Sequence, residues 1–179
     1  PDLIISVGGG SVMDLAKISN VTCKNNNLKN QILDNSVLIE KEHCKHIAIP
    51  TTAGSGAEVT TNAVIYVDNI KYSVEHELIK PTYMALFPEL IIKNNKLNII
   101  QSSAFDSFAQ AVESMFSVKS TSESLLNSKK SIKFFLSNYK KFISNKNLEN
   151  AYKLSLSSYY SGKAISISKT IAPHAVSYP

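Results

Sequence analysis

The chain has 179 residues and a formal net charge of +5, which lysine alone carries because the sequence contains no arginine. Nucleic-acid-binding proteins cluster their positive charge and use arginine forks on phosphates and bases, so the scattered lysines disfavour a nucleic-acid partner. No apolar run approaches the roughly 20 residues that span a bilayer, which disfavours a membrane partner. Cys23 and Cys44 are too few for a disulfide framework and lack metal-ligand spacing, so we expect a cytoplasmic protein.

The first part of the chain alternates apolar runs with loops. Residues 3–7 form a continuous apolar run, which is typical of a buried parallel strand. Ser11 then has the place of a helix N-cap, and Asp14 stands three residues on in the capping-box position. This helix is expected to end within residues 23–30. Further along, the pattern predicts strands at residues 46–50, 63–67 and 83–87, with a turn at residues 68–71.

The second part is predicted to be helical. From about Gln101 onward, apolar residues recur at three- and four-residue spacing: Ala104, Phe108, Ala111, Val112 and Met115. Residues 124–142 predict a second helix and residues 148–165 a third. We therefore divide the chain into an α/β part, residues 1–98, with an incomplete Rossmann-like parallel sheet, and an all-helical part, residues 99–179.

Both ends of the chain break off within patterned segments. Residues 1–7 already resemble a core strand with no earlier strand to pair with. Residues 171–179 stop in the middle of a patterned segment. We therefore expect a fragment that lacks both ends of a longer protein.

Three glycines, Gly8, Gly9 and Gly10, separate the first predicted strand from the first helix. Backbone N–H groups and the positive end of the helix dipole point to the same spot there, and the missing Cβ atoms let a phosphate come close. The spacing matches neither common nucleotide fingerprint, and glycine also marks many purely structural turns. From this loop alone, an anion site and a structural turn both stay open.

A second loop, PTTAGSGAE at residues 50–58, follows the carboxyl end of another predicted strand. It places the hydroxyl groups of Thr51, Thr52 and Ser55 among small residues. Ligands of open parallel sheets bind beyond the carboxyl ends of the strands. The two loops could therefore hold the two ends of a dinucleotide, whereas the alternative is a pair of ordinary surface loops.

The segments GGGSVMDLAK, PTTAGSGAEVT and AFDSFAQAVES occur in an order and spacing that resemble the iron-containing (group III) alcohol dehydrogenase family, whose architecture is like that of dehydroquinate synthase. The resemblance implies an N-terminal domain that binds NAD or NADP, a helical domain that carries a divalent metal, a cleft between them, and a homo-oligomer. It also favours the phosphate-loop interpretation of the glycines. The cofactor-binding residues that it implies are Gly9, Gly10, Ser11, Asp14, Thr51, Thr52, Ser55 and Lys71.

The family's metal pattern is met only in part. Asp106 matches the aspartate of Asp-x-x-x-His, but Gln110 stands in the place of that histidine. Further on, Thr170 replaces the first histidine of His-x-x-x-His, and His174 matches the second. Imidazole is a strong ligand for Fe or Zn, whereas an amide or a hydroxyl is a weak one. Asp106 and Gln110 are thus candidate ligands for a loosely held cation (Fe, Zn, Mn or Mg), or metal-free polar residues of the cleft.

A cluster of hydrogen-bond donors stands where further metal ligands would be expected: Ser166, Ser168, Lys169, Thr170 and His174. Lysine binds phosphate as a point charge, so this cluster suits an anionic substrate group. The segment resembles the phosphonoacetaldehyde reductase subgroup, which implies reduction of phosphonoacetaldehyde to 2-hydroxyethylphosphonate. Lys169 and His174 are the candidate catalytic residues, which would stabilise the oxyanion and supply the proton. The alternative for His174 is a hydrogen-bonded core histidine.

The leading hypothesis is an NAD(P)H-dependent alcohol dehydrogenase or aldehyde reductase with a small aldehyde or alcohol as substrate. A general reductase of small neutral aldehydes is one alternative, and a cofactor-binding fragment without turnover is another. Lyases related to dehydroquinate synthase share the fold. They place arginine around a phosphate, and the absence of arginine from this chain disfavours them.

Overall fold

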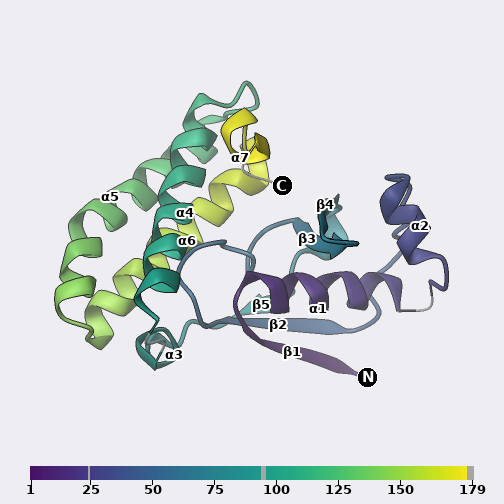
Figure 1. Cartoon of the computed structure of the whole chain (residues 1–179), viewed down its shortest axis with the longest axis horizontal. Coiled ribbons are helices and arrows are strands. Elements are labelled where there is room, and N and C mark those ends of the chain that lie inside the picture. Colours follow the sequence, from purple (N-terminus) through teal and green to yellow (C-terminus); the bar gives the residue numbers. More distant parts are fainter. Residues whose placement is uncertain (24, 94–95, 177–179) are drawn as a thin grey trace.

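The computed structural model of the protein describes residues 1–23, 25–93 and 96–176. Residues 177–179, the end of the segment expected to break off, lie outside the described residues, as does Lys24 in the segment expected to end the first helix. In the part of the chain that the structure describes, no helix is both long and apolar enough to cross a membrane. The expected fold class is confirmed, because a small parallel sheet precedes a helical region (Figure 1).

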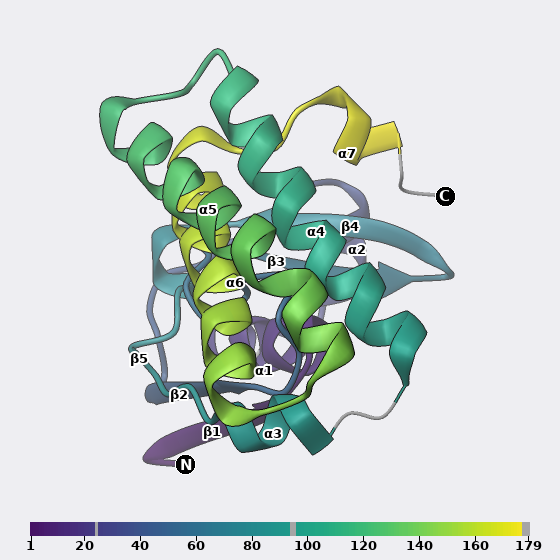
Figure 2. The same cartoon turned by 90° about the vertical axis from the view of Figure 1, so that its left-hand side faces the viewer.

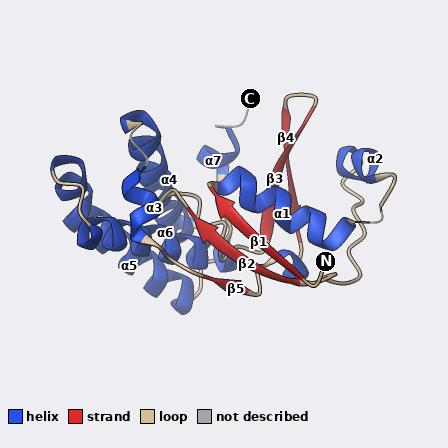
Figure 3. Cartoon of the chain, turned by 90° about the horizontal axis from the view of Figure 1, so that it is seen from below, coloured by secondary structure: helices blue, strands red, loops and turns tan. Residues whose placement is uncertain are grey.

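The sheet contains β1 (Leu3–Gly8), β2 (Lys45–Pro50) and β5 (Tyr83–Met84), which run parallel in the order β1-β2-β5. Helix α1 (Gly10–Thr22) packs along β1 and β2 (Figure 3). On the buried face, Ser6 Oγ and His46 Nε2 lie 2.8 Å apart, which satisfies both polar groups. The prediction that this strand is buried is only half right. On the opposite face Leu3, Ile5 and Val7 are about half exposed, because the side chains of β1 alternate between a buried and an open side of the sheet.

A β-hairpin packs against α1 beside this sheet. It contains β3 (Asn62–Val67) and β4 (Ile70–Glu75), which pair antiparallel, and α1 contacts β3. The tip residues Asp68 and Asn69 both have positive φ, 50° and 66°, as a tight two-residue hairpin turn requires. Short elements flank the hairpin: α2 (Leu28–Leu33) before β2 and the 3₁₀ helix η1 (Glu77–Ile79) after β4.

Two sequence predictions in this region need correction. The predicted turn at residues 68–71 is confined to its first two residues. The strand β4 that follows was missed because its first two residues were assigned to the turn, although Ile70, Tyr72 and Val74 alternate with polar residues. The strand predicted at residues 83–87 is reduced to Tyr83–Met84. Residues 85–87 have no regular secondary structure and connect this strand to α3 (Pro88–Lys93).

The helical part consists of α4 (Leu97–Phe116), α5 (Ser122–Ser144), α6 (Leu148–Ser168) and the short α7 (Ala172–Val176). The first three pack side by side, as Figure 2 shows, and α3 packs against α6. Thr121 and Ser124 form a capping box at the start of α5, and Asn147 caps α6. The three predicted long helices are therefore confirmed with boundaries that differ by a few residues, whereas the division after residue 98 stays a prediction.

The loop after β2 meets α6 at a contact that only glycine allows. Gly56 has a φ of 64°, and a Cβ atom added to Gly162 would lie 2.7 Å from the Gly56 carbonyl oxygen and 2.9 Å from its Cα. Nearby, Ser166 Oγ donates to the Val59 carbonyl oxygen over 3.2 Å. The loop that carries the second sequence motif is thus fixed against the helical part.

We expect the variant Gly162→Ala to be destabilised by about 1–3 kcal/mol, because the added methyl group overpacks this contact. Alanine is otherwise the better helix former by about 1 kcal/mol, so an unhindered site would give the opposite sign. Urea unfolding of the full-length protein measures the difference, with Lys163→Ala as the control on the neighbouring, half-buried position of α6. A stabilised Gly162→Ala protein would contradict the close approach.

Candidate functional cleft

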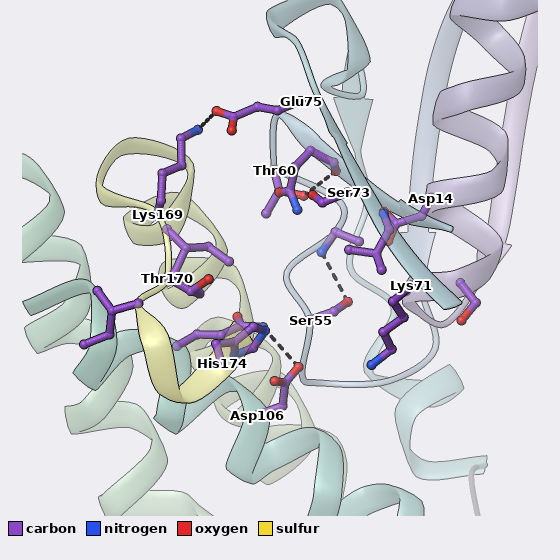
Figure 4. A pocket seen from close by; sticks show the side chains of 18 of the residues that line it. Asp14, Ser55, Thr60, Lys71, Ser73, Glu75, Asp106, Lys169, Thr170 and His174 are labelled. Carbon is purple, nitrogen blue, oxygen red and sulfur yellow. Dashed lines mark hydrogen bonds and ion pairs between the residues drawn. The ribbon is translucent and has the colours of Figure 1, made fainter. Parts of the chain in front are cut away.

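A cleft of about 670 Å³ lies between the α/β part and the helical part. Its walls are the start of α1, the loop after β2, the hairpin, α4 and the segment from α6 to α7 (Figure 4). Small-molecule sites in proteins have volumes of roughly 300–1,000 Å³, so this cleft has the size of a ligand site. Most of the sequence-predicted site residues line it: Gly10, Ser11, Asp14, Ser55, Lys71, Asp106, Gln110, Lys169 and His174.

The glycine loop enters α1 directly at one wall of the cleft. Gly9 is the N-cap, with extended backbone, and makes no side-chain cap. The prediction that Ser11 caps the helix is wrong, because Ser11 is already the second helical residue. The first N–H groups of a helix have no intrahelical partner, and they carry the positive end of its dipole. Gly10 and Ser11 line the cleft, so the first N–H groups of α1 lie at its wall in an arrangement that suits an anion.

The second loop divides its hydroxyl groups between two places. Ser55 lines the cleft, and a Cβ atom on Gly10 would lie only 2.8 Å from Ser55 Oγ, so the two loops are in contact. Thr51 and Thr52 instead line a small inner cavity next to α3 and α4. The Thr51 N–H donates to the Gly8 carbonyl oxygen over 2.9 Å, which joins the loops at their base.

Asp14 and Lys17 form a buried ion pair on the cleft side of α1. The predicted capping box is wrong, because the Asp14 carboxylate accepts from Lys17 Nζ at 3.3 Å and from the Val64 N–H at 3.1 Å. The fully buried Lys17 ammonium also donates to Thr60 Oγ1 and to the Asn62 carbonyl oxygen, at 2.8 and 2.9 Å. Burial raises the pKa of Asp14 and lowers the pKa of Lys17, and the attraction between the two charges opposes both shifts.

Glu58 is a further buried carboxyl group that the sequence motifs did not single out. It is 2% exposed, and its Oε1 has no hydrogen-bond partner among the described residues. Burial raises the pKa of Glu58 to about 7, although the Lys17 ammonium acts in the opposite direction. The (i, i+3) spacing of Asp14 and Lys17 was a readable signal for their pair. Nothing comparable in the sequence marks Glu58 as buried.

The candidate metal ligands form a hydrogen-bonded pair. Gln110 Nε2 donates to Asp106 Oδ2 at 3.0 Å, while Gln110 Oε1 accepts from Ser161 Oγ at 3.3 Å. Burial raises the pKa of Asp106 above its usual value, and the nearby His174 opposes this shift in part. No group of three His, Cys, Asp or Glu side chains within residues 1–23, 25–93 and 96–176 could hold a metal ion. The pair offers one carboxylate and one amide and no imidazole, which is a weak donor set for iron or zinc.

The residues of the donor cluster predicted at the end of α6 do not all face the cleft. Ser168 is fully buried and donates to Ser114 Oγ at 2.7 Å, so its assignment to a substrate-facing cluster is wrong. Ser166 is turned to the Val59 carbonyl oxygen. Lys169 and Thr170 do line the cleft. The sequence predicted the cluster from proximity along the chain, but the last turn of a helix points its residues in different directions.

His174 lies in the cleft at the start of α7 and is supported from α4. Its Nδ1 is 3.6 Å from Glu113 Oε1, and Glu113 Oε2 accepts from the Ile171 N–H at 2.8 Å. Glu113, which the sequence reasoning missed, thus fixes both the segment before α7 and the imidazole. The alternative of a core histidine is not supported, because His174 is half-buried and lines the cleft.

Comparisons with known proteins agree with this arrangement. The family model for iron-containing alcohol dehydrogenase matches residues 1–88. Three relatives align with nearly the whole chain. The chain is 28% identical to long-chain-alcohol dehydrogenase 1 of Geobacillus thermodenitrificans, covering 99% of this chain and 46% of that protein. It is 30% identical to 4-hydroxybutyrate dehydrogenase of Clostridium kluyveri, and the match covers 98% of this chain and 48% of that protein. It is 26% identical to phosphonoacetaldehyde reductase of Streptomyces viridochromogenes, and the match covers 99% of this chain and 47% of that protein.

The fold likewise matches a solved structure of sulfoacetaldehyde reductase from Bifidobacterium kashiwanohense in complex with NAD⁺. The TM-score is 0.90 at 25% sequence identity, over 98% of this chain and 47% of that one. The chain spans about half the length of the relatives it matches.

Because the raised pKa of Glu58 disfavours its ionised form in the fold, stability should fall as the pH rises from the unfolded pKa of 4.5 to about 7 and then stay level. The total loss is about 3 kcal/mol. Glu58→Gln removes this loss, so the variant should be more stable than the unsubstituted protein at pH 8 and much closer to it at pH 5. Urea unfolding at both pH values measures the difference, with the exposed Glu77→Gln as control. An equal difference at the two pH values would show that Glu58 does not titrate in this way.

Proposed function

We propose that the chain belongs to the iron-containing alcohol dehydrogenase family and that the full-length protein is a nicotinamide-dependent oxidoreductase that interconverts a small alcohol and its aldehyde. One observation carries the proposal. The glycine loop at the start of α1 and the residues Lys169, Thr170 and His174 line the same cleft from opposite walls. A cofactor held by the first wall therefore faces proton and charge donors on the second.

On the cofactor side, the backbone at Gly9, Gly10 and Ser11 is proposed to bind the pyrophosphate. Ser55 and Lys71 face the same space, so they are assigned to the cofactor as well. Asp14 is assigned a supporting role, because Lys17 and Val64 already occupy its carboxylate oxygens. Thr51 and Thr52 are predicted to reach the nicotinamide side, although here they join the loops and line the inner cavity. The NAD⁺ in the structure of the similar sulfoacetaldehyde reductase favours NAD(H) over NADP(H).

When bound, the reduced nicotinamide supplies the hydride for the aldehyde carbon. The chain itself must position the carbonyl group and deliver a proton to its oxygen. His174 is proposed to supply that proton, and Glu113, whose Oε1 lies 3.6 Å from His174 Nδ1, orients the imidazole ring. Lys169 and Thr170 are proposed to bind the distal group of the substrate. The assignment of a cation to Asp106 and Gln110 stays a prediction, and no step of this proposal depends on it.

The substrate is proposed to be a small aldehyde with an anionic group. Lys169 supplies the positive charge at the cleft wall. The names of three similar proteins refer to compounds with such a group: 4-hydroxybutyrate, phosphonoacetaldehyde and sulfoacetaldehyde. Neutral aldehydes are the second candidate class, because the similar dehydrogenase of Geobacillus thermodenitrificans is named for long-chain alcohols. Cofactor binding without turnover is the outcome to expect if the family's missing histidines are indispensable.

Substitution Gly9→Val tests the cofactor site. A Cβ atom at Gly9 meets Thr52 Oγ1 only at 3.5 Å, an ordinary contact, so the variant should fold. If the pyrophosphate binds to the backbone at Gly9 as proposed, the added side chain should hinder its approach, so NADH affinity should fall at least about tenfold, a loss of roughly 1.4 kcal/mol. Titration of NADH fluorescence in the full-length protein measures it. Leu15→Ala, on the exposed side of the same helix, is the control. Unchanged affinity in a folded Gly9→Val protein would remove the cofactor assignment.

Substitution Lys169→Met tests the substrate site. Loss of one charge-assisted contact costs about 1.5–3 kcal/mol, so kcat/KM for an anionic aldehyde should fall by about 10- to 150-fold. A neutral aldehyde of the same length should lose much less, since it makes no ionic contact. The assay compares 4-oxobutanoate with butanal in the full-length protein and in the variant. Equal small effects on the two substrates would favour the neutral-aldehyde alternative.

A further inference from the structure

The ammonium group of Lys169 is held at the mouth of the cleft by partners on both walls. Lys169 ends α6 with a positive φ of 62°, and its Nζ donates to the Ser166 carbonyl oxygen at 3.1 Å. The same Nζ forms an ion pair with Glu75, the last residue of β4 on the opposite wall (Figure 4). The cation proposed to bind the substrate therefore already has a carboxylate neighbour.

The side chains that line the rest of the cleft carry both positive and negative charges. Asp14 is paired with the buried Lys17. The remaining charged side chains of the lining are two lysines and two carboxyl groups: Lys71, Lys169, Glu75 and Asp106. A substrate with one negative charge can share Lys169 with Glu75, whereas a second negative charge on the same group lies next to the Glu75 carboxylate.

We infer that Glu75 is a specificity-determining residue that restricts the substrate to aldehydes with a single negative charge, such as a sulfonate or a carboxylate, and disfavours a doubly charged phosphonate. This inference rests on the proposed function, because Lys169 must bind the anionic group. Two anions bound to one ammonium lie a few ångströms apart, and at a partly solvated site their repulsion changes affinity by about tenfold per added charge. The Glu75 side chain is 51% exposed, so water weakens this repulsion without abolishing it.

Sulfoacetaldehyde and phosphonoacetaldehyde form a matched pair for the test. Their tetrahedral groups are similar in size, but at pH 8 the sulfonate carries one charge and the phosphonate nearly two, as for phosphate groups with a second pKa of about 6. We would measure kcat/KM for both with NADH, in the full-length protein and in Glu75→Gln and Glu75→Lys. The unsubstituted protein should prefer sulfoacetaldehyde by about tenfold, Glu75→Gln should nearly equalise the two, and Glu75→Lys should reverse the preference.

The variant Glu77→Gln is the control, because it removes the same charge two residues away, at an exposed position that does not line the cleft. It should leave the preference unchanged. NADH binding to each variant shows that the fold is retained, since β4 pairs with β3 through its backbone whatever the side chain at position 75.

The outcomes separate this inference from the proposed function. If both anionic aldehydes are reduced and the ratio stays constant across Glu75→Gln and Glu75→Lys, the role of Glu75 is overturned and the proposed function stands. A preference of the unsubstituted protein for phosphonoacetaldehyde would also overturn it. If the full-length protein reduces only neutral aldehydes, or none, the substrate assignment to Lys169 fails and the inference fails with it.

Discussion

A buried ammonium group that must find oxygen partners is the constraint on which the rest of the structure depends. Lys17 is fully buried, and a buried charge without partners costs several kcal/mol. Its three acceptors are Asp14, Thr60 and the Asn62 carbonyl oxygen, and Asp14 in turn accepts from the Val64 N–H. These contacts fix the hairpin to the helix that begins at the glycine loop, and so place one complete wall of the cleft.

The other wall is fixed to the first by small residues and by one carboxylate. Gly56 and Gly162 let the second loop touch α6, and Glu113 holds the segment that leads into α7. The two walls therefore keep the start of α1 opposite Lys169 and His174. The proposed nicotinamide cofactor and small charged aldehyde fit this arrangement, since one wall offers helix N–H groups to a phosphate and the other offers an ammonium and an imidazole to the substrate.

Much of this could be predicted from the sequence, for physical reasons that differ from residue to residue. The long amphipathic helices and the strand-glycine-helix start depend on local patterns, so their prediction was confirmed. Three features depend on partners distant in sequence. They are the hydrogen bond that Asp14 accepts from the Val64 N–H of β3, the burial of Ser168 against Ser114 on α4, and the half-open face of β1, which depends on the side of the sheet that α1 covers. Glu75 was missed with its strand, because Ile70 and Lys71 were assigned to the turn although Ile70, Tyr72 and Val74 alternate with polar residues. The ion pair of Glu75 with Lys169 also joins two residues that are distant in sequence.

The central claim is that the glycine loop and the loop after β2 together hold the cofactor in the cleft. Hydrogen exchange of the full-length protein, followed by mass spectrometry with and without NADH, tests it most directly. The account predicts slower exchange at residues 8–12 and 54–57 when NADH is bound, and no change at residues 140–150, in the distant groove between α5 and α6. Unchanged exchange at both loops under saturating NADH would contradict it.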